Sequence, residues 1–132
     1  MMEKVFHCFR WKFYRETGKT KKVTEYPCDG KLLKAAEQVK TKYHTGRGVI
    51  GSGDEWNNQL DRIALLRERY HTAVEDMESA AAASFAFLME YRFLACGSCS
   101  NSIVNGEKFD EAVGIDGQKF MLSLIDQMRE YM

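Results

Sequence analysis

Three short polar segments carry the residue types from which a ligand site could be built. The first is Glu75-Asp76-Met77-Glu78, in which acidic side chains surround a methionine. A carboxylate accepts hydrogen bonds from both hydroxyls of a cis-diol such as ribose, and a methionine offers an apolar floor. The same carboxylates suit the start of a helix, where they bind free N–H groups and complement the helix dipole. The residue types leave both interpretations open, a sugar site and a capped helix.

The other two segments offer an aromatic ring and amides. Trp56 and Asn57 follow a glycine-rich stretch. Trp56 is either a lid on the core or a ring that stacks on a base, an interaction worth ~1–3 kcal/mol in nucleic-acid sites. Ser100-Asn101 follows an apolar run, and an asparagine presents a donor and an acceptor that suit the edge of a heterocycle. On its own, however, this second segment is an ordinary turn.

Cys96 and Cys99 have the C-x-x-C spacing that redox and zinc sites use. The pair lies in an apolar run that predicts a strand, where no helix N-terminus would stabilise a thiolate. A zinc site needs two further ligands, and the sequence contains no second C-x-x-C and no H-x-x-x-H. The sequence therefore predicts core cysteines, no metal site and no cofactor.

The elements that must position these residues alternate along the chain. Strands are expected where β-branched, aromatic or apolar residues run together, namely in a strand or hairpin arm over 4–14, at Val49-Ile50, over 71–74 and over 92–99. Helices are expected where apolar residues recur at spacings of three and four, over 30–43, 58–70, 77–91 and 110–131. This alternation predicts an α/β fold with three α/β/α layers, in which ligands bind beyond the carboxyl ends of the strands.

Length and charge exclude several classes of protein. The 132 residues suit a single domain, since domains usually contain ~100–150 residues. The sequence contains 19 basic residues (Lys and Arg) and 19 acidic residues (Asp and Glu), so its formal net charge is zero. This balance argues against a partner bound through bulk charge, such as nucleic acid. No apolar stretch approaches the ~20 residues of a membrane span, and the N-terminus lacks the pattern of a secretory signal. We therefore expect a cytoplasmic protein that binds neither nucleic acid nor membrane.

Three stretches resemble a known superfamily. They are GVIGSGDEWN (48–57), AVEDMESAAAA (73–83) and FLACGSCSNS (93–102). In order and spacing they resemble the C-terminal half of the nucleoside phosphorylase and nucleosidase superfamily, above all the methylthioadenosine/S-adenosylhomocysteine nucleosidases. The resemblance covers roughly residues 25–132, and the arm over 1–25 matches only loosely. It implies part of a phosphorylase-type sheet flanked by helices, in a family whose members are commonly oligomers.

The resemblance implies a ribose site at the acidic segment. Met77 stands where a methionine packs under the ribose, and Glu78 stands where a glutamate binds the sugar hydroxyls. Asp76 occupies the neighbouring acidic position. These three residues are the expected ribose contacts.

The resemblance also implies a base site and a catalytic position. Trp56 stands where the family has an aromatic residue against the base, with Asn57 and Ser100 in the base pocket. Asn101 stands where methylthioadenosine enzymes have an aspartate that protonates purine N7, so Asn101 is the expected catalytic residue. Its amide cannot act as a general acid, but it can donate a hydrogen bond to N7 or to a 6-oxo edge. By the same resemblance, relatives tend to have an arginine at the position of Gly97. This chain therefore lacks the bidentate donor that a guanidinium would supply.

The expected function is nucleosidase-type hydrolysis of the N-glycosidic bond of a purine nucleoside, either methylthioadenosine/S-adenosylhomocysteine-like or inosine-like. Family members are close to twice as long, and their N-terminal half carries the glycine-rich loop and the carboxylate that activates water. The isolated chain is therefore expected to be inactive without that half. The alternatives are a non-catalytic nucleoside-binding or storage-type protein and a purine nucleoside phosphorylase. The expected partners are the nucleoside and either further copies of the chain or a complementary N-terminal half.

Overall fold

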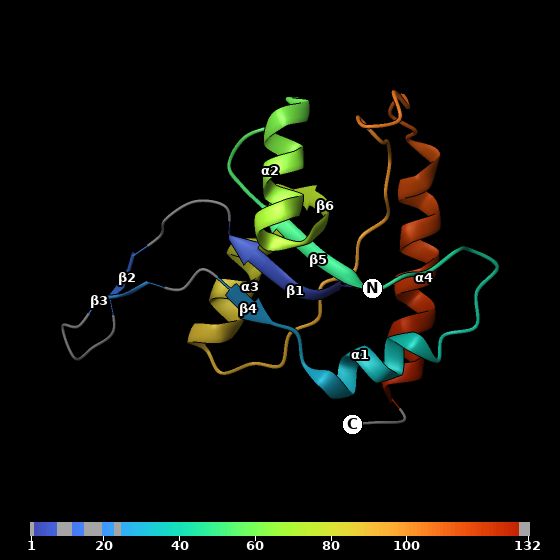
Figure 1. Cartoon of the computed structure of the whole chain (residues 1–132). Coiled ribbons are helices and arrows are strands. Elements are labelled where there is room, and N and C mark those ends of the chain that lie inside the picture. Colours follow the sequence, from blue (N-terminus) through green and yellow to red (C-terminus); the bar gives the residue numbers. More distant parts are fainter. Residues whose placement is uncertain (1, 8–11, 15–19, 23–24, 130–132) are drawn as a thin grey trace.

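The computed structural model describes residues 2–7, 12–14, 20–22 and 25–129, with side chains from residue 25 onward. Its main sheet contains four strands in the order β4, β1, β5, β6 (Figure 1). These strands are β1 (Met2–His7), β4 (Glu25–Pro27), β5 (Gly48–Ser52) and β6 (Thr72–Asp76). Strands β1, β5 and β6 are parallel, and β4 pairs with β1 in the antiparallel direction.

Helices cover both faces of this sheet. They are α1 (Gly30–Glu37), α2 (Leu60–Tyr70), α3 (Ser79–Leu88) and α4 (Ala112–Met128). Helix α2 packs on β5 and β6, whereas α3 packs on β1, β4 and β5 from the opposite side (Figure 1). Helix α4 contacts α1. The expected α/β class, a largely parallel sheet flanked by helices, is confirmed.

The arm expected over 4–14 divides between two sheets, because β1 joins the main sheet and Lys12–Tyr14 begins a hairpin. Strands β2 (Lys12–Tyr14) and β3 (Thr20–Lys22) pair in the antiparallel direction and form a separate small sheet. The side chains of this arm lie outside the described residues.

The strand expected over 92–99 is wrong, because these residues belong to no sheet of the described chain. The segment is held at one end, where the Asp29 backbone N–H donates to the Phe93 carbonyl at 2.7 Å. No described strand lies beside it to form a hydrogen-bonded ladder. Its apolar sequence favours burial, but a strand also needs a neighbour for its backbone groups.

The first helix is shorter than its apolar periodicity predicts. It begins cleanly, because the Asp29 carboxylate accepts hydrogen bonds from the backbone N–H groups of Lys31 and Leu32 at 2.8 and 2.9 Å. It ends at Glu37 rather than near Tyr43. The Tyr43 hydroxyl instead donates to the Asp116 carboxylate of α4 at 2.6 Å. This bond is the main cause of a pKa below the ordinary value at Asp116 and above it at Tyr43.

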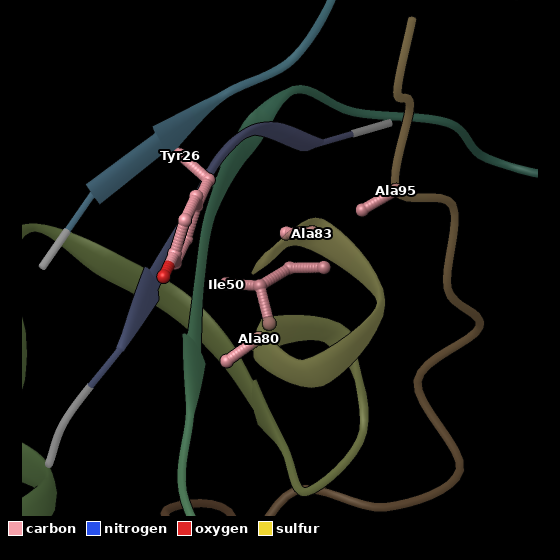
Figure 2. Packing of buried hydrophobic residues seen from close by; sticks show 5 residues of the cluster. All are labelled: Tyr26, Ile50, Ala80, Ala83 and Ala95. Carbon is pink, nitrogen blue, oxygen red and sulfur yellow. The ribbon is translucent and has the colours of Figure 1, made fainter. Parts of the chain in front are cut away.

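The core under α3 is built from small side chains. Tyr26, Ile50, Ala80, Ala83 and Ala95 form one buried cluster, in which the alanines of α3 face Ile50 of the sheet (Figure 2). Alanines three residues apart let the helix approach the sheet closely, and Ala83 is only 1% exposed. Little room is left for a larger side chain at this contact.

Enlarging Ala83 is therefore expected to destabilise the fold. Ala83→Leu forces bulk between α3 and the sheet and should lower the free energy of unfolding by about 1–3 kcal/mol in urea denaturation. Ala82→Leu, at an exposed position of the same helix, is the matched control and should change little. Equal effects of the two substitutions would contradict this packing.

Candidate functional site

The carboxyl ends of β5 and β6 lie side by side. Ser52 and Asp76 are paired residues of the two parallel strands. Just beyond them, the Gly53 backbone N–H donates to the Asp76 carbonyl at 3.0 Å. The two loops that follow, which carry the expected base and ribose contacts, therefore start from one edge of the sheet. This edge is where parallel α/β sheets bind their ligands.

A side-chain hydrogen bond joins the two loops. The Asn57 amide donates through Nδ2 to Glu75 Oε2 at 2.9 Å. Glu75 was recognised as part of the acidic segment, but sequence reasoning gave it no role. The structure shows that it connects the loop after β5 with the end of β6. It thereby fixes the position of Asn57, the expected base contact.

The start of α3 is bound to both strand ends. The Asp76 carboxylate accepts hydrogen bonds from the backbone N–H of Ser79, at 3.2 Å, and from the Ser79 hydroxyl. The hydroxyl of Ser52, a residue only 1% exposed, accepts from the backbone N–H of Ala80 at 3.0 Å. Asp76 thus caps the helix, which was one of the two interpretations open for the acidic segment. Sequence reasoning missed Ser52, for which the signal is a hydroxyl residue at the last position of an apolar strand.

Met77 and Glu78 lie uncovered between β6 and α3. Met77 is 44% exposed, and its backbone N–H donates to Glu78 Oε2 at 3.1 Å. Trp56 is 58% exposed, so it does not act as a lid on the core. An indole face, a thioether and a carboxylate are therefore accessible along one edge of the sheet. These groups can contact a planar base, an apolar sugar face and hydroxyl donors, respectively.

Ser100 and Asn101 have a different environment. The Ser100 hydroxyl donates to Asn101 Oδ1 at 3.2 Å, and the Ser100 carbonyl accepts from the Asp110 backbone N–H at 2.8 Å. Among the described residues, the hydrogen bonds of this pair stay within the segment 100–110. The structure therefore brings the expected residues after β5 and β6 together, but it does not bring Asn101 into contact with them.

Helix α4 supports the segment that carries Asn101. A Cβ added at Gly117 would lie 2.8 Å from the Ser98 hydroxyl oxygen, so the segment packs directly on the helix there. A Cβ at Gly97, by contrast, would meet no atom within 4 Å. Space is therefore available at Gly97 for a Cβ atom.

The three cysteines among the described residues are at most partly buried. Cys28 and Cys96 are half-buried, and burial is the main cause that raises the pKa of each thiol. Cys99 is exposed, so the expected core position is wrong for this residue. Across the described residues, no three or more His, Cys, Asp or Glu side chains gather as a metal ion would require. None of the described helices is both long and apolar enough to cross a membrane.

Known proteins share this fold and sequence pattern. Residues 7–128 match the Phosphorylase superfamily, and the chain belongs to it. It is similar to a 5'-methylthioadenosine/S-adenosylhomocysteine nucleosidase of Bacillus pumilus (strain SAFR-032), with 30% identity over 112 residues that cover 77% of this chain and 48% of the relative.

A solved structure supports the same fold. A futalosine hydrolase mutant of Helicobacter pylori strain 26695 gives a TM-score of 0.70 at 20% identity, over 96% of this chain and 58% of that chain. The chain thus spans roughly half the length of the relatives it matches, 48% in one and 58% in the other. The resemblance predicted from its motifs is confirmed at the level of the superfamily.

Removing the Ser52 hydroxyl should weaken the attachment of α3 to β5. Ser52→Ala leaves the buried Ala80 N–H without its acceptor and is expected to lower the free energy of unfolding by about 1–3 kcal/mol. Ser123→Ala is the control, because its hydroxyl donates to Lys119 on the exposed side of α4. Thermal denaturation measures both variants, and an unchanged melting temperature for Ser52→Ala would argue against this role.

Proposed function

We propose that the chain supplies the nucleoside-binding part of a nucleosidase that hydrolyses the N-glycosidic bond of a purine nucleoside. The observation that carries the proposal is the uncovered group of Trp56, Met77 and Glu78 at the adjoining ends of β5 and β6. Membership of the superfamily supports it, as do the names of the two relatives, a nucleosidase and a hydrolase. The substrate is a methylthioadenosine/S-adenosylhomocysteine-like or inosine-like nucleoside.

In this proposal the residues after β6 hold the ribose. Glu78 accepts hydrogen bonds from the sugar hydroxyls, and Met77 packs against the apolar face of the ring. Asp76 contributes to the ribose site mainly by position, since its carboxylate is bound to Ser79 and fixes the turn that presents Glu78. Holding the sugar in one orientation favours reaction, because the substrate loses its translational and rotational entropy when it binds. The barrier of the chemical step then no longer includes that loss.

The residues after β5 and the segment from Ser100 hold the base. Trp56 stacks on the purine, while Asn57 and Ser100 contact its edge. In hydrolysis, the bond between C1′ and the purine breaks with the electron pair leaving on the base, and a water oxygen adds to C1′. The sugar passes through an oxocarbenium-like state, as in glycoside hydrolysis. Asn101 stabilises the negative charge that develops on the departing purine by donating to N7.

The activation of water is assigned to a part of the domain outside this chain. The chain covers 48% of one relative and 58% of the other, so both relatives are long enough to contain that part. We therefore propose that the 132 residues form a single C-terminal half-domain that binds nucleoside alone and releases free base only as part of a whole domain.

Calorimetric titration tests the ribose site. The chain is expected to bind 5′-methylthioadenosine or inosine, and Glu78→Gln should weaken this binding about 10- to 100-fold, because a hydrogen bond to a charged group is worth about 1.5–3 kcal/mol. The matched control is Glu68→Gln, at an exposed position of α2. Failure of the unaltered chain to bind any purine nucleoside would refute the proposal. The chain by itself is expected to release no free base during these titrations, which chromatography checks.

The group at position 101 is expected to set the preference for the purine. An asparagine amide can donate to a 6-oxo group, whereas a carboxylate accepts from a 6-amino group. Asn101→Asp should therefore shift the ratio of affinities towards 5′-methylthioadenosine and away from inosine. The same titrations measure this ratio, and equal ratios for both proteins would show that residue 101 does not contact the 6-substituent.

A further inference from the structure

Two half-buried cysteines lie on neighbouring segments of the chain. Cys28 directly follows β4, and Cys96 belongs to the segment over 92–99. The Asp29 backbone N–H donates to the Phe93 carbonyl at 2.7 Å, so the chain just after Cys28 is bound to the chain just before Cys96. The proposed nucleoside site uses neither thiol.

Contacts of the side chains bring the two cysteines closer together. Cys28 packs against the buried cluster that contains Ala95, and its thiol is hydrogen-bonded to the Ala95 backbone (Figure 2). Cys96 is the next residue along the chain. Burial is the main cause that raises the pKa of the Cys96 thiol, and a negative charge on Cys28 raises this pKa further. Because such an effect weakens with distance, the two sulfur atoms lie near each other.

A pocket gives small molecules access to Cys28. It has a volume of about 290 Å³, and its lining includes Cys28, Asp29, Arg92 and Phe93. The pocket therefore lies where the two segments that carry the cysteines meet. A thiol enclosed in a packed core is inert, whereas one that lines a pocket can be reached by a reagent in the folded chain.

We infer that Cys28 and Cys96 form a reversible redox site, in which a low-molecular-weight disulfide converts the two thiols into one protein disulfide. The bond joins the end of β4 to the segment that leads to Ser100 and Asn101. Oxidation thus fixes, by a covalent bond, the segment that carries the expected catalytic residue. The inference concerns the thiols and does not depend on nucleoside hydrolysis.

Cys99 is nearer to Cys96 in the sequence but is not the expected partner. The segment over 92–99 contains no turn or bend, and such a chain extends about 10 Å over three residues. A disulfide requires Cα atoms within about 7 Å of each other. A bond between Cys96 and Cys99 would therefore require the segment to fold back on itself, whereas Cys28 already lies beside it.

Two exchange steps form the bond. One thiolate of the pair attacks a sulfur of the external disulfide, which gives a mixed disulfide and releases one external thiol. The second thiolate attacks the protein sulfur of the mixed disulfide and releases the other external thiol. The external disulfide is reduced to two thiols, which take up the two protons that the cysteines lose. Burial, the main cause of a raised pKa at both cysteines, makes the exchange slow near neutral pH, because the thiolate is the nucleophile.

Peptide mapping after oxidation tests the inference. The 132-residue chain is incubated with oxidised glutathione, its remaining thiols are alkylated, and it is digested with trypsin. Trypsin cleaves after Lys and Arg, so Cys28 lies in the peptide 23–31, whereas Cys96 and Cys99 share the peptide 93–108. Mass spectrometry is expected to show these two peptides linked, and dithiothreitol should separate them.

Substitutions locate the bond. Every protein carries Cys8→Ser, which removes the cysteine outside the described residues. Cys99→Ser should then leave the yield of linked peptides unchanged, whereas Cys28→Ser and Cys96→Ser should each abolish the link. The equilibrium constant for the bond, measured against glutathione, is expected to be at least about tenfold larger in the native chain than in urea, because the fold holds the two thiols together.

Three outcomes would overturn the inference. The first is the absence of linked peptides from the native chain. The second is a bond that includes Cys99, seen either inside the peptide 93–108 or as a link that Cys99→Ser abolishes. The third is an equal equilibrium constant in the native chain and in urea, which would show that the fold does not bring the two sulfur atoms together. None of these measurements uses a nucleoside, so failure here is distinguishable from failure of the proposed function.

Discussion

The attachment of α3 to the ends of β5 and β6 is the constraint on which the rest of the structure depends. The first turn of a helix has backbone N–H groups without partners in the helix itself. Ser52 and Asp76, from two neighbouring strands, supply acceptors for the N–H groups of Ala80 and Ser79. Because one helix start binds two strand ends, the loops that leave those strands are held at a common edge.

Around the start of α3, some polar residues are used in hydrogen bonds of the fold, and others remain accessible to a ligand. Asp76 and Ser52 are used by the fold, whereas Trp56, Met77 and Glu78 remain uncovered beside them. The hydrogen bond between Asn57 and Glu75 orders the loop between the two groups. A rigid strand edge can therefore present accessible groups without losing its own backbone hydrogen bonds.

The same helix relates the core to the outer surface. Its alanines allow close packing on β1, β4 and β5, which makes the core small. The phenylalanines and the leucine of α3 lie largely outside that core and are 42–59% exposed. A sheet with parallel strands is usually covered on both faces and extended by further strands.

The sequence by itself determined the order of most elements and the composition of the strand-end loops. Apolar periodicity located the helices to within a few residues, except for α1, because it is a local property of the chain. The motifs identified the superfamily because their residue types and spacing are visible without coordinates. Only the tertiary structure decided that Asp76 caps α3, that Ser52 supports it, and that residues 92–99 form no strand. The Asp76 cap is local, and the structure chose between the two interpretations that the residue types left open. Ser52 instead binds a helix N–H 28 residues away, and a strand over 92–99 requires a neighbour that local sequence does not specify.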